Sequence, residues 1–165
     1  MGAGTMGAGI AQVGCLAGFE TFLHDPFPDA LERGVESVHA GLGKGAERGR
    51  WSADEAGAAA ERLHPATALD ELAPCGLAIE AAPEDLDLKR DLLRKLSDIC
   101  GPNVLLATNT SSLPVTAIAS GAARPENVVG MHFFNPAPLM KLLEVVAGSE
   151  SSDEALATAR SVGER

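Results

Sequence analysis

A histidine and a glutamate are the side chains of this sequence best suited to moving a proton. His132 follows an apolar run at residues 128–131, and Glu144 lies inside a second apolar run at residues 142–146. A carboxylate inside a hydrophobic strand is costly unless it is paired. The economical partner is His132, because Glu144 could accept the Nδ1–H of its ring and fix its tautomer. We therefore predict a general base and the group that orients it, against the alternative of a buried histidine that an incidental glutamate satisfies.

A second polar segment, with the sequence N-T-S-S at residues 109–112, follows the apolar run 104–108. The carboxyl ends of parallel strands meet at one edge of a sheet, where ligands bind. The hydroxyl groups of this segment could therefore reach the pocket of His132. The alternative is a local role, because the same residue types cap helices and a short helix is predicted at residues 114–119.

The N-terminal residues have the spacing G-x-G-x-x-G at the start of a helical pattern. The loop consists of Gly2, Gly4, Thr5, Met6 and Gly7. The first glycine permits the turn, the second lets the backbone approach a pyrophosphate, and the third allows close packing of the helix. Asp25 ends the next predicted strand, where a carboxylate accepts hydrogen bonds from both ribose hydroxyls and repels a 2′-phosphate. The glycines alone could be a structural turn, but together with Asp25 they predict a site for NAD rather than NADP.

The elements that must position these residues alternate along the chain. Strands are predicted at residues 19–24, 77–82, 104–108, 128–132 and 142–146. Helices are predicted at residues 10–17, 31–42, 53–63, 83–99, 114–119 and 152–162. This alternation implies crossover connections between strands. It predicts an α/β fold, a Rossmann-like doubly wound and mostly parallel sheet with a helical hairpin inserted after the second strand.

Local signals place the starts of two of these helices. Ser52 and Glu55 have the spacing of a capping box before residues 53–63. Pro83 suits a first helical position, and the acids Glu84 and Asp85 would then lie in the first turn, where they favour the helix dipole.

The strand that should lead into the glycine loop is missing, because only Met1 precedes Gly2. In such sheets the first strand normally lies in the middle. We therefore expect residues 1–165 to be a dinucleotide-binding domain that is truncated at both ends and lacks its first strand.

Composition excludes several classes of function. The net charge is -10 and basic residues do not cluster, which argues against a nucleic-acid partner or an anionic membrane surface. The longest apolar runs are strand-sized, and no signal peptide is visible, so that we expect a cytoplasmic protein without a membrane partner. The three cysteines form no C-x-x-C pair, and we expect neither a disulfide framework nor a metal site.

Four segments in register resemble the 3-hydroxyacyl-CoA dehydrogenase family, in particular the 3-hydroxybutyryl-CoA dehydrogenases. They read G-A-G-T-M-G-A-G-I-A, E-A-A-P-E-D-L-D-L-K-R, A-T-N-T-S-S-L and M-H-F-F-N-P-A-P-L-M-K-L-L-E-V-V. The resemblance covers nearly the whole chain. It implies oxidation of an L-3-hydroxyacyl-CoA to the 3-ketoacyl-CoA, or the reverse, with NAD carrying the hydride, which is the type of reaction that occurs in fatty-acid β-oxidation.

The resemblance also implies roles for single residues in catalysis. His132 would take the hydroxyl proton, and Glu144 would orient His132 and stabilise its cation. Ser111 would bond the reacting oxygen, and Asn135 would shape the same pocket.

Further residues are assigned to the cofactor by the same resemblance. Glu84 and Lys89 would contact the ribose on the nicotinamide side, against the alternative of an acidic helix start with a surface lysine. Ala81 and Asn109 are assigned to the cofactor site as well.

Members of this family continue beyond the equivalent of Arg165 into a helical C-terminal domain that closes over the acyl chain and forms a homodimer interface. We expect that domain to be absent from this chain. Two alternatives therefore stay open: a non-catalytic or unstable NAD-binding fragment, and a relative that acts on a different 3-hydroxy acid. The length of the acyl chain, the direction of the reaction and the pathway also stay open.

Overall fold

The computed structural model describes residues 1–165, which form two compact units. The N-terminal unit comprises Gly2–Leu69 and Asn135–Lys141. The C-terminal unit comprises Met1, Asp70–Phe134 and Leu142–Arg165. Each unit has its own sheet and is described separately.

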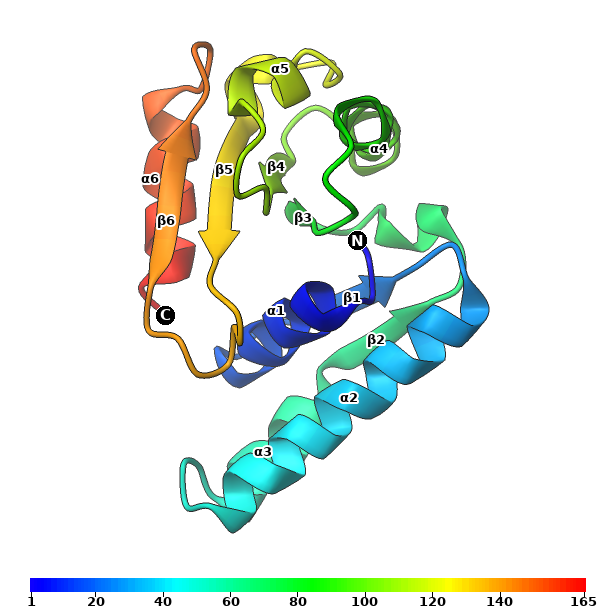
Figure 1. Cartoon of the computed structure of the whole chain (residues 1–165), viewed down its shortest axis with the longest axis vertical. Coiled ribbons are helices and arrows are strands. Elements are labelled where there is room, and N and C mark those ends of the chain that lie inside the picture. The colour runs from blue at the N-terminus through cyan, green and yellow to red at the C-terminus, as the bar shows by residue number, and fades with distance from the viewer. The chain divides into compact units, whose positions relative to one another are not determined.

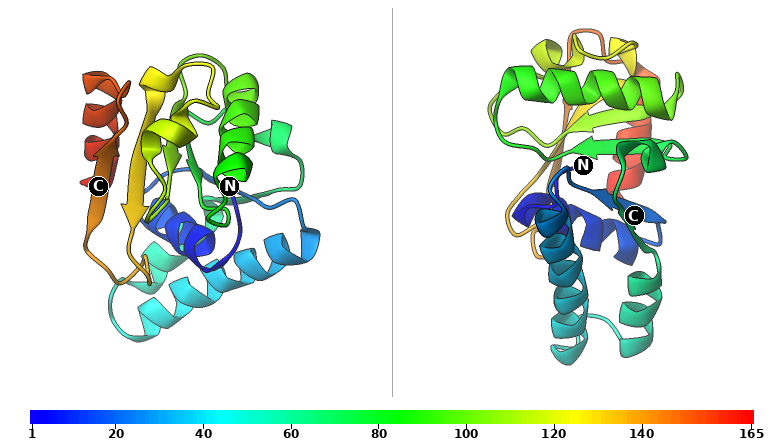
Figure 2. Two further views of the ribbon diagram at one scale, coloured as in Figure 1. Left: turned by 45° about the horizontal axis from the view of Figure 1, so that its top comes forward. Right: turned by 90° about the vertical axis from the view of Figure 1, so that its right-hand side faces the viewer.

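The N-terminal unit consists of helices packed around one pair of parallel strands (Figure 1). Its elements are α1 (Thr5–Leu16), β1 (Thr21–His24), α2 (Pro28–Glu47), α3 (Ala53–Glu61) and β2 (Leu63–Ala66). The helices α2 and α3 form the expected hairpin, whose two arms are seen side by side in Figure 2. Their apolar faces cover a core in which Leu23, Val38 and Ala59 are almost fully buried.

The start of α3 confirms one local prediction, and its end corrects another. The Ser52 side chain accepts from the Glu55 N–H while Glu55 accepts from the Ser52 N–H, which is the predicted capping box. The helix predicted to run to residue 63 ends at Glu61, and β2 follows at once. This strand contains Pro65, which it accommodates because β2 pairs with β1 alone and is an edge strand.

The C-terminal unit is a four-stranded sheet in the order β3-β4-β5-β6. Its elements are β3 (Leu77–Glu80), α4 (Leu86–Cys100), β4 (Leu105–Thr108), α5 (Val115–Ala119), β5 (Val128–Phe133), β6 (Leu143–Ala147) and α6 (Asp153–Gly163), with short 3-10 turns at Leu69–Leu72 and Pro125–Asn127. The pairs β3-β4 and β4-β5 are parallel, whereas β6 runs antiparallel to β5. This parallel-dominated sheet confirms the predicted Rossmann-like α/β class.

Alternating residues of the central strands face different helices. Ala107 and Met131 pack in one buried cluster with Ala155 and Ala159 of α6. On the other face, Gly130 lies so close to α5 that an added Cβ would lie 3.0 Å from Val115. The strand β4 is buried along its whole length, as expected for a parallel strand covered on both faces.

The start of α4 differs from the prediction. The helix begins at Leu86, and Asp85 is its N-cap, with Oδ1 accepting a hydrogen bond from Leu88 N at 2.9 Å. Pro83 and Glu84 therefore lie in the loop before the helix and not in its first turn. The physical reason is that Asp85 at the N-cap accepts from a free N–H of the first turn, whereas a helix starting at Pro83 would have Ala82 at its N-cap, whose side chain has no acceptor.

Residues before α1 pair with strands of both units. Within the C-terminal unit, the Met1 amino group donates to Ile79 O, and Ala81 N donates to Met1 O at 2.9 Å, which is the pattern of a parallel ladder. Within the N-terminal unit, Gly2 N donates to His24 O at 2.8 Å. None of the helices has the length and apolar character required to cross a membrane.

Candidate active site

The glycine loop of the N-terminal unit leaves the first turn of α1 open. Gly2 has a φ of 90°, in the region that favours glycine, and Gly4 is the N-cap of α1 without any side-chain cap. A Cβ at Gly4 would meet no atom within 4 Å. Free N–H groups at a helix N-terminus bind phosphate, so that the loop offers both donors and space for a pyrophosphate.

Asp25 is tied to this loop. Its Oδ2 accepts a hydrogen bond from Ala3 N at 2.9 Å, and its Oδ1 accepts one from Phe27 N at 3.0 Å. Each carboxylate oxygen keeps a further lone pair. The carboxylate is thus fixed beside the glycine loop and can still accept from ribose hydroxyls.

His132 and Glu144 lie directly opposite each other on β5 and β6. His132 Nδ1 is 2.9 Å from Glu144 Oε2, and Nε2 makes no hydrogen bond within the chain. The His132 ring also packs against Phe134, with ring centroids 4.6 Å apart. The structure therefore brings the two predicted side chains together and leaves one ring nitrogen open for a proton.

The surroundings of this pair differ from those expected. The Glu144 side chain is 53% exposed and that of His132 is 20% exposed. The pairing of these residues therefore does not follow from the cost of burying a carboxylate. It follows from the antiparallel register, which places the two side chains on the same face of neighbouring strands.

The segment after β4 is held by side-chain contacts rather than by capping a helix. Asn109 Oδ1 accepts from Phe133 N at 2.8 Å, which links the ends of β4 and β5. The N-cap of α5 is Pro114, and no side chain caps this helix. The alternative reading of residues 109–112 as a cap for α5 is therefore wrong.

The Glu84 carboxylate accepts hydrogen bonds from two hydroxyl residues of this segment. It accepts from Ser111 N at 2.8 Å, from Ser111 Oγ at 3.3 Å and from Thr110 Oγ1 at 2.8 Å. Partial burial on its own would raise the pKa of the Glu84 carboxyl, but these hydrogen bonds and the charge of Lys89 outweigh it and hold the pKa below its usual value. Glu84 is thus an anion that orients Ser111.

Lys89 is buried, so that its alternative reading as a surface lysine is wrong. Its side chain is 1% exposed, and Nζ donates to Glu80 Oε1 at 2.8 Å and to Ala82 O at 3.0 Å. Nζ also lies 3.8 Å from Glu84 Oε2. The structure places the predicted cofactor ligands Glu84 and Lys89 together, and their contact with a ribose stays a prediction.

Glu80 was not found by sequence reasoning. Its side chain is fully buried at the end of β3, where it binds Lys89 and Thr108. The signal was present, because a carboxylate inside an apolar strand needs a partner, which is the argument that singled out Glu144.

Two further predicted site residues make no side-chain hydrogen bond. One is Asn135, which belongs to the N-terminal unit. Ala81 is half-buried after β3 and uses its N–H on Met1. Their roles stay predictions.

None of the three cysteines has the lowered thiol pKa of a nucleophile. Burial raises the pKa of the thiols of Cys15, Cys75 and Cys100, which keeps them protonated at neutral pH. The structure contains no group of three or more histidine, cysteine, aspartate or glutamate side chains able to hold a metal ion.

Comparisons with known proteins agree on one family. Residues 1–165 match the model of the family described as "3-hydroxyacyl-CoA dehydrogenase, NAD binding domain". The chain is 46% identical over 154 residues to the 3-hydroxyadipyl-CoA dehydrogenase of Escherichia coli (strain K12), covering 93% of this chain and 32% of that protein. It is 44% identical over 164 residues to the probable 3-hydroxybutyryl-CoA dehydrogenase of Deinococcus radiodurans, covering 99% of this chain and 58% of that protein.

Solved structures give the same result. A crystal structure of 3-hydroxybutyryl-CoA dehydrogenase from Escherichia coli K12 matches 99% of this chain and 34% of its own, with 43% identity and a TM-score of 0.95. A crystal structure of (S)-3-hydroxybutyryl-CoA dehydrogenase from Ralstonia eutropha matches 99% of this chain and 58% of its own, with 36% identity and a TM-score of 0.95. The chain thus spans less than two thirds of each of these relatives. The matches confirm the resemblance inferred from the four sequence segments, and NAD as the cofactor.

Proposed function

The chain belongs to the family of NAD-binding domains of 3-hydroxyacyl-CoA dehydrogenases, and from this premise we propose that its full-length protein interconverts an L-3-hydroxyacyl-CoA and the 3-ketoacyl-CoA. The observation that supports this reaction is the 2.9 Å contact between His132 Nδ1 and Glu144 Oε2, which leaves Nε2 to exchange a proton with the substrate. When bound, NAD would accept the hydride that leaves the third carbon of the acyl group.

In the direction of oxidation, His132 Nε2 accepts the proton of the substrate hydroxyl. The ring then carries a positive charge, which the Glu144 carboxylate stabilises through the Nδ1–H hydrogen bond. Ser111 Oγ, which in the structure donates to Glu84 Oε1 at 3.3 Å, would turn its single O–H to the same substrate oxygen and hold it in place, while the Ser111 N–H stays bonded to Glu84. In the direction of reduction, the imidazolium returns its proton to the oxygen as the hydride arrives.

The open backbone groups of the glycine loop fit a dinucleotide. The N–H groups at the start of α1 would bind the pyrophosphate, Asp25 the adenosine ribose, and Glu84 the ribose on the nicotinamide side. The Glu84 side chain is 40% exposed, which leaves its carboxylate accessible to a ligand while it holds Ser111.

The names of the relatives support an acyl-CoA substrate but differ in its acyl group. One relative is a 3-hydroxyadipyl-CoA dehydrogenase and another a probable 3-hydroxybutyryl-CoA dehydrogenase. We propose acyl-CoA as the substrate class without choosing the chain length. A homodimer and a cytoplasmic location stay predictions for the full-length protein.

The experiment compares wild type with His132→Ala in the full-length gene product that contains residues 1–165. A well-placed base contributes about 10²- to 10⁴-fold, or roughly 3 to 5 kcal/mol of transition-state stabilisation. We expect kcat for acetoacetyl-CoA-dependent oxidation of NADH to fall by that factor, while the Kd for NADH, measured by nicotinamide fluorescence, stays unchanged. Undiminished turnover would refute His132 as the base. Saturable NADH binding without turnover in wild type would instead favour the non-catalytic alternative.

A further inference from the structure

A buried ion pair in the C-terminal unit has no part in the reaction described so far. The side chains of Glu80 and Lys89 are 0% and 1% exposed, and their charged atoms are 2.8 Å apart. Thr108, fully buried and directly opposite Glu80 on β4, donates its hydroxyl to Glu80 Oε2 at 2.7 Å. All three side chains are therefore desolvated, and Glu80 bonds to both of the others.

Stability alone does not explain such a group. Removing two charges from water costs several kcal/mol per ion. Replacing a buried ion pair by well-packed apolar residues often leaves a protein equally stable or more stable. What the charges add is a fixed geometry for the loop between β3 and α4. Glu80 Oε1 accepts from Ala82 N at 2.5 Å, and Lys89 Nζ donates to Ala82 O at 3.0 Å. Both backbone groups of Ala82 are thus held by the ion pair.

This loop leads directly to the Glu84 carboxylate. Glu84 follows Ala82 by two residues, and its Oε2 lies 3.8 Å from Lys89 Nζ. Glu84 in turn accepts from the backbone N–H and the hydroxyl of Ser111. A continuous series of polar contacts therefore leads from Thr108 through Glu80, Lys89 and Glu84 to Ser111.

We propose that Glu80 is a positioning residue, which with Lys89 and Thr108 holds the loop that presents Glu84. Glu84 in turn fixes Ser111 through its backbone N–H, so that the Ser111 hydroxyl can turn from Glu84 to the substrate oxygen. The proposal rests on the proposed function, since it assumes that Ser111 bonds the reacting oxygen.

The test uses Thr108→Val, because Glu80→Gln would leave a buried ammonium without its counter-charge and threaten folding. Valine keeps the volume and branching of threonine but removes the hydroxyl that Glu80 Oε2 needs. Thr108→Ser keeps that hydroxyl and is the matched variant. An unsatisfied buried acceptor costs about 1–3 kcal/mol, or roughly 5- to 150-fold in an equilibrium.

Two measurements follow in the full-length gene product. The first is amide hydrogen exchange at Ser111, whose N–H is bonded to Glu84. We expect exchange to be about tenfold faster in Thr108→Val and unchanged in Thr108→Ser. The second is kcat in a double-mutant cycle with Ser111→Ala. Thr108→Val should lower kcat about tenfold in the presence of Ser111 and hardly at all in Ser111→Ala, because both changes disturb the same hydroxyl.

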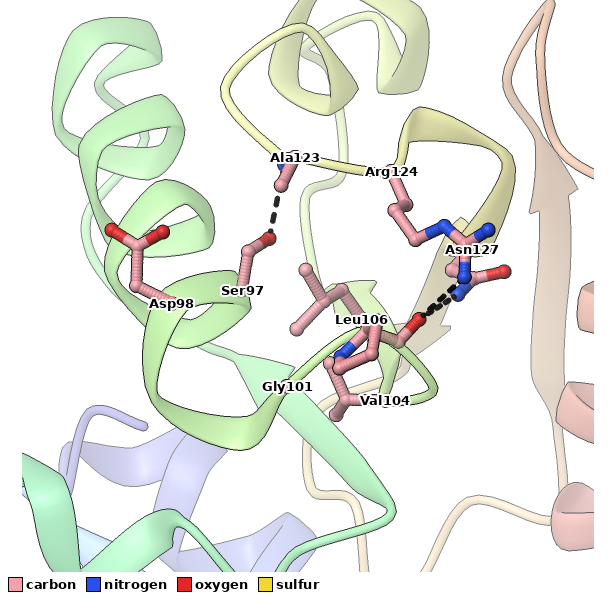
Figure 3. Close-up of a pocket in the computed structure, with 9 residues that line it drawn as sticks. Ser97, Asp98, Gly101, Val104, Leu106, Ala123, Arg124 and Asn127 are labelled. Atoms are coloured by element: carbon pink, nitrogen blue, oxygen red, sulfur yellow. Dashed lines mark hydrogen bonds between the residues drawn. The ribbon is translucent and has the colours of Figure 1, made fainter.

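A control lies at the other end of the same sheet. Figure 3 shows a pocket at the amino ends of β4 and β5, with Ser97 and Ala123 on its wall. Ser97 Oγ accepts a hydrogen bond from Ala123 N at 3.2 Å. Ser97→Ala also removes one hydroxyl from this unit, and it should leave both kcat and exchange at Ser111 unchanged.

The outcomes separate this proposal from the proposed function. Unchanged exchange at Ser111 in Thr108→Val overturns the positioning role, whether or not the protein is active. Faster exchange with strictly additive losses of kcat overturns it as well, because Thr108 would then act on the reaction by another route. If Ser111→Ala alone leaves kcat unchanged, the proposed contact of Ser111 with the substrate is refuted. The amide exchange rate of Ser111 then decides alone whether Glu80 and Thr108 position this residue.

Discussion

The charge of Glu144 can be separated from its hydrogen bond by the substitution Glu144→Gln. A glutamine oxygen can still accept from His132 Nδ1 across the 2.9 Å contact and keep the ring in the same tautomer. The variant therefore loses only the negative charge that, in the proposed reaction, stabilises the imidazolium formed when His132 holds the substrate proton.

The size of this loss follows from the exposure of the pair. Two unit charges 4 Å apart interact with about 1 kcal/mol in bulk water and about 4 kcal/mol at the effective dielectric constant of a protein surface. Because the Glu144 side chain is 53% exposed, solvent screens the pair and the lower part of this range applies. We expect kcat to fall about 5- to 30-fold, which is less than the loss expected for His132→Ala.

The assay is acetoacetyl-CoA-dependent oxidation of NADH at saturating concentrations of both substrates, with the Kd for NADH measured in parallel. The Kd should not change, because Glu144 is expected to touch neither the glycine loop nor a ribose. Raising the salt concentration should reduce the difference between wild type and Glu144→Gln, since exposed charges are screened. A loss as large as that of His132→Ala would refute the reasoning, because the hydrogen bond rather than the charge would then be decisive. A loss of less than twofold would refute the stabilising role itself.

Three further predictions concern the cofactor loop and Glu84. Asp25→Ala should weaken NADH binding about tenfold and reduce the preference over NADPH, both measured by fluorescence titration, because it removes the ribose acceptor and the charge that repels a 2′-phosphate. Gly2→Ala should lower the free energy of unfolding by roughly 1–2 kcal/mol, because φ is 90° at this position. Gly4→Ala should leave the free energy of unfolding unchanged, because the added Cβ meets no protein atom, and should weaken NADH binding, because the Cβ would occupy space expected for the pyrophosphate. Since folding lowers the pKa of the Glu84 carboxyl below its ordinary value of 4.5, wild type should be more stable than Glu84→Gln above that pH and lose this advantage as the pH falls through the lowered pKa, which denaturant titrations over a pH series would detect.

Much of the fold could be predicted because its signals are local. The glycine spacing, the capping box at Ser52 and the apolar runs of the strands each depend on neighbouring residues, and all four strands of the C-terminal sheet lie where they were expected. The strand β2 could not be predicted in this way. Its four residues include Pro65, and only pairing with β1 makes them a strand.

The site was predictable where residue type and strand position were sufficient. His132 and Glu144 were found as a pair, but the argument from burial was wrong, and the antiparallel register brings them together. The contacts of Glu84 with Ser111 join residues 27 positions apart through two loops. No local pattern contains such a contact, so that the sequence could indicate both residues without indicating that they touch.

Glu80, Glu84 and Glu144 of the C-terminal unit show why strand position decides what a carboxylate can do. Glu144 lies on the edge strand β6, where water screens its charge and only a modest electrostatic effect on His132 is available. Glu80 ends β3 beneath α4, where full burial requires a counter-charge, and Lys89 supplies it. Glu84 follows in the loop, partly exposed, and can therefore hold Ser111 and still meet a ligand. A buried carboxylate that fixes the backbone can therefore place the partly exposed carboxylate that follows it without removing that side chain from solvent.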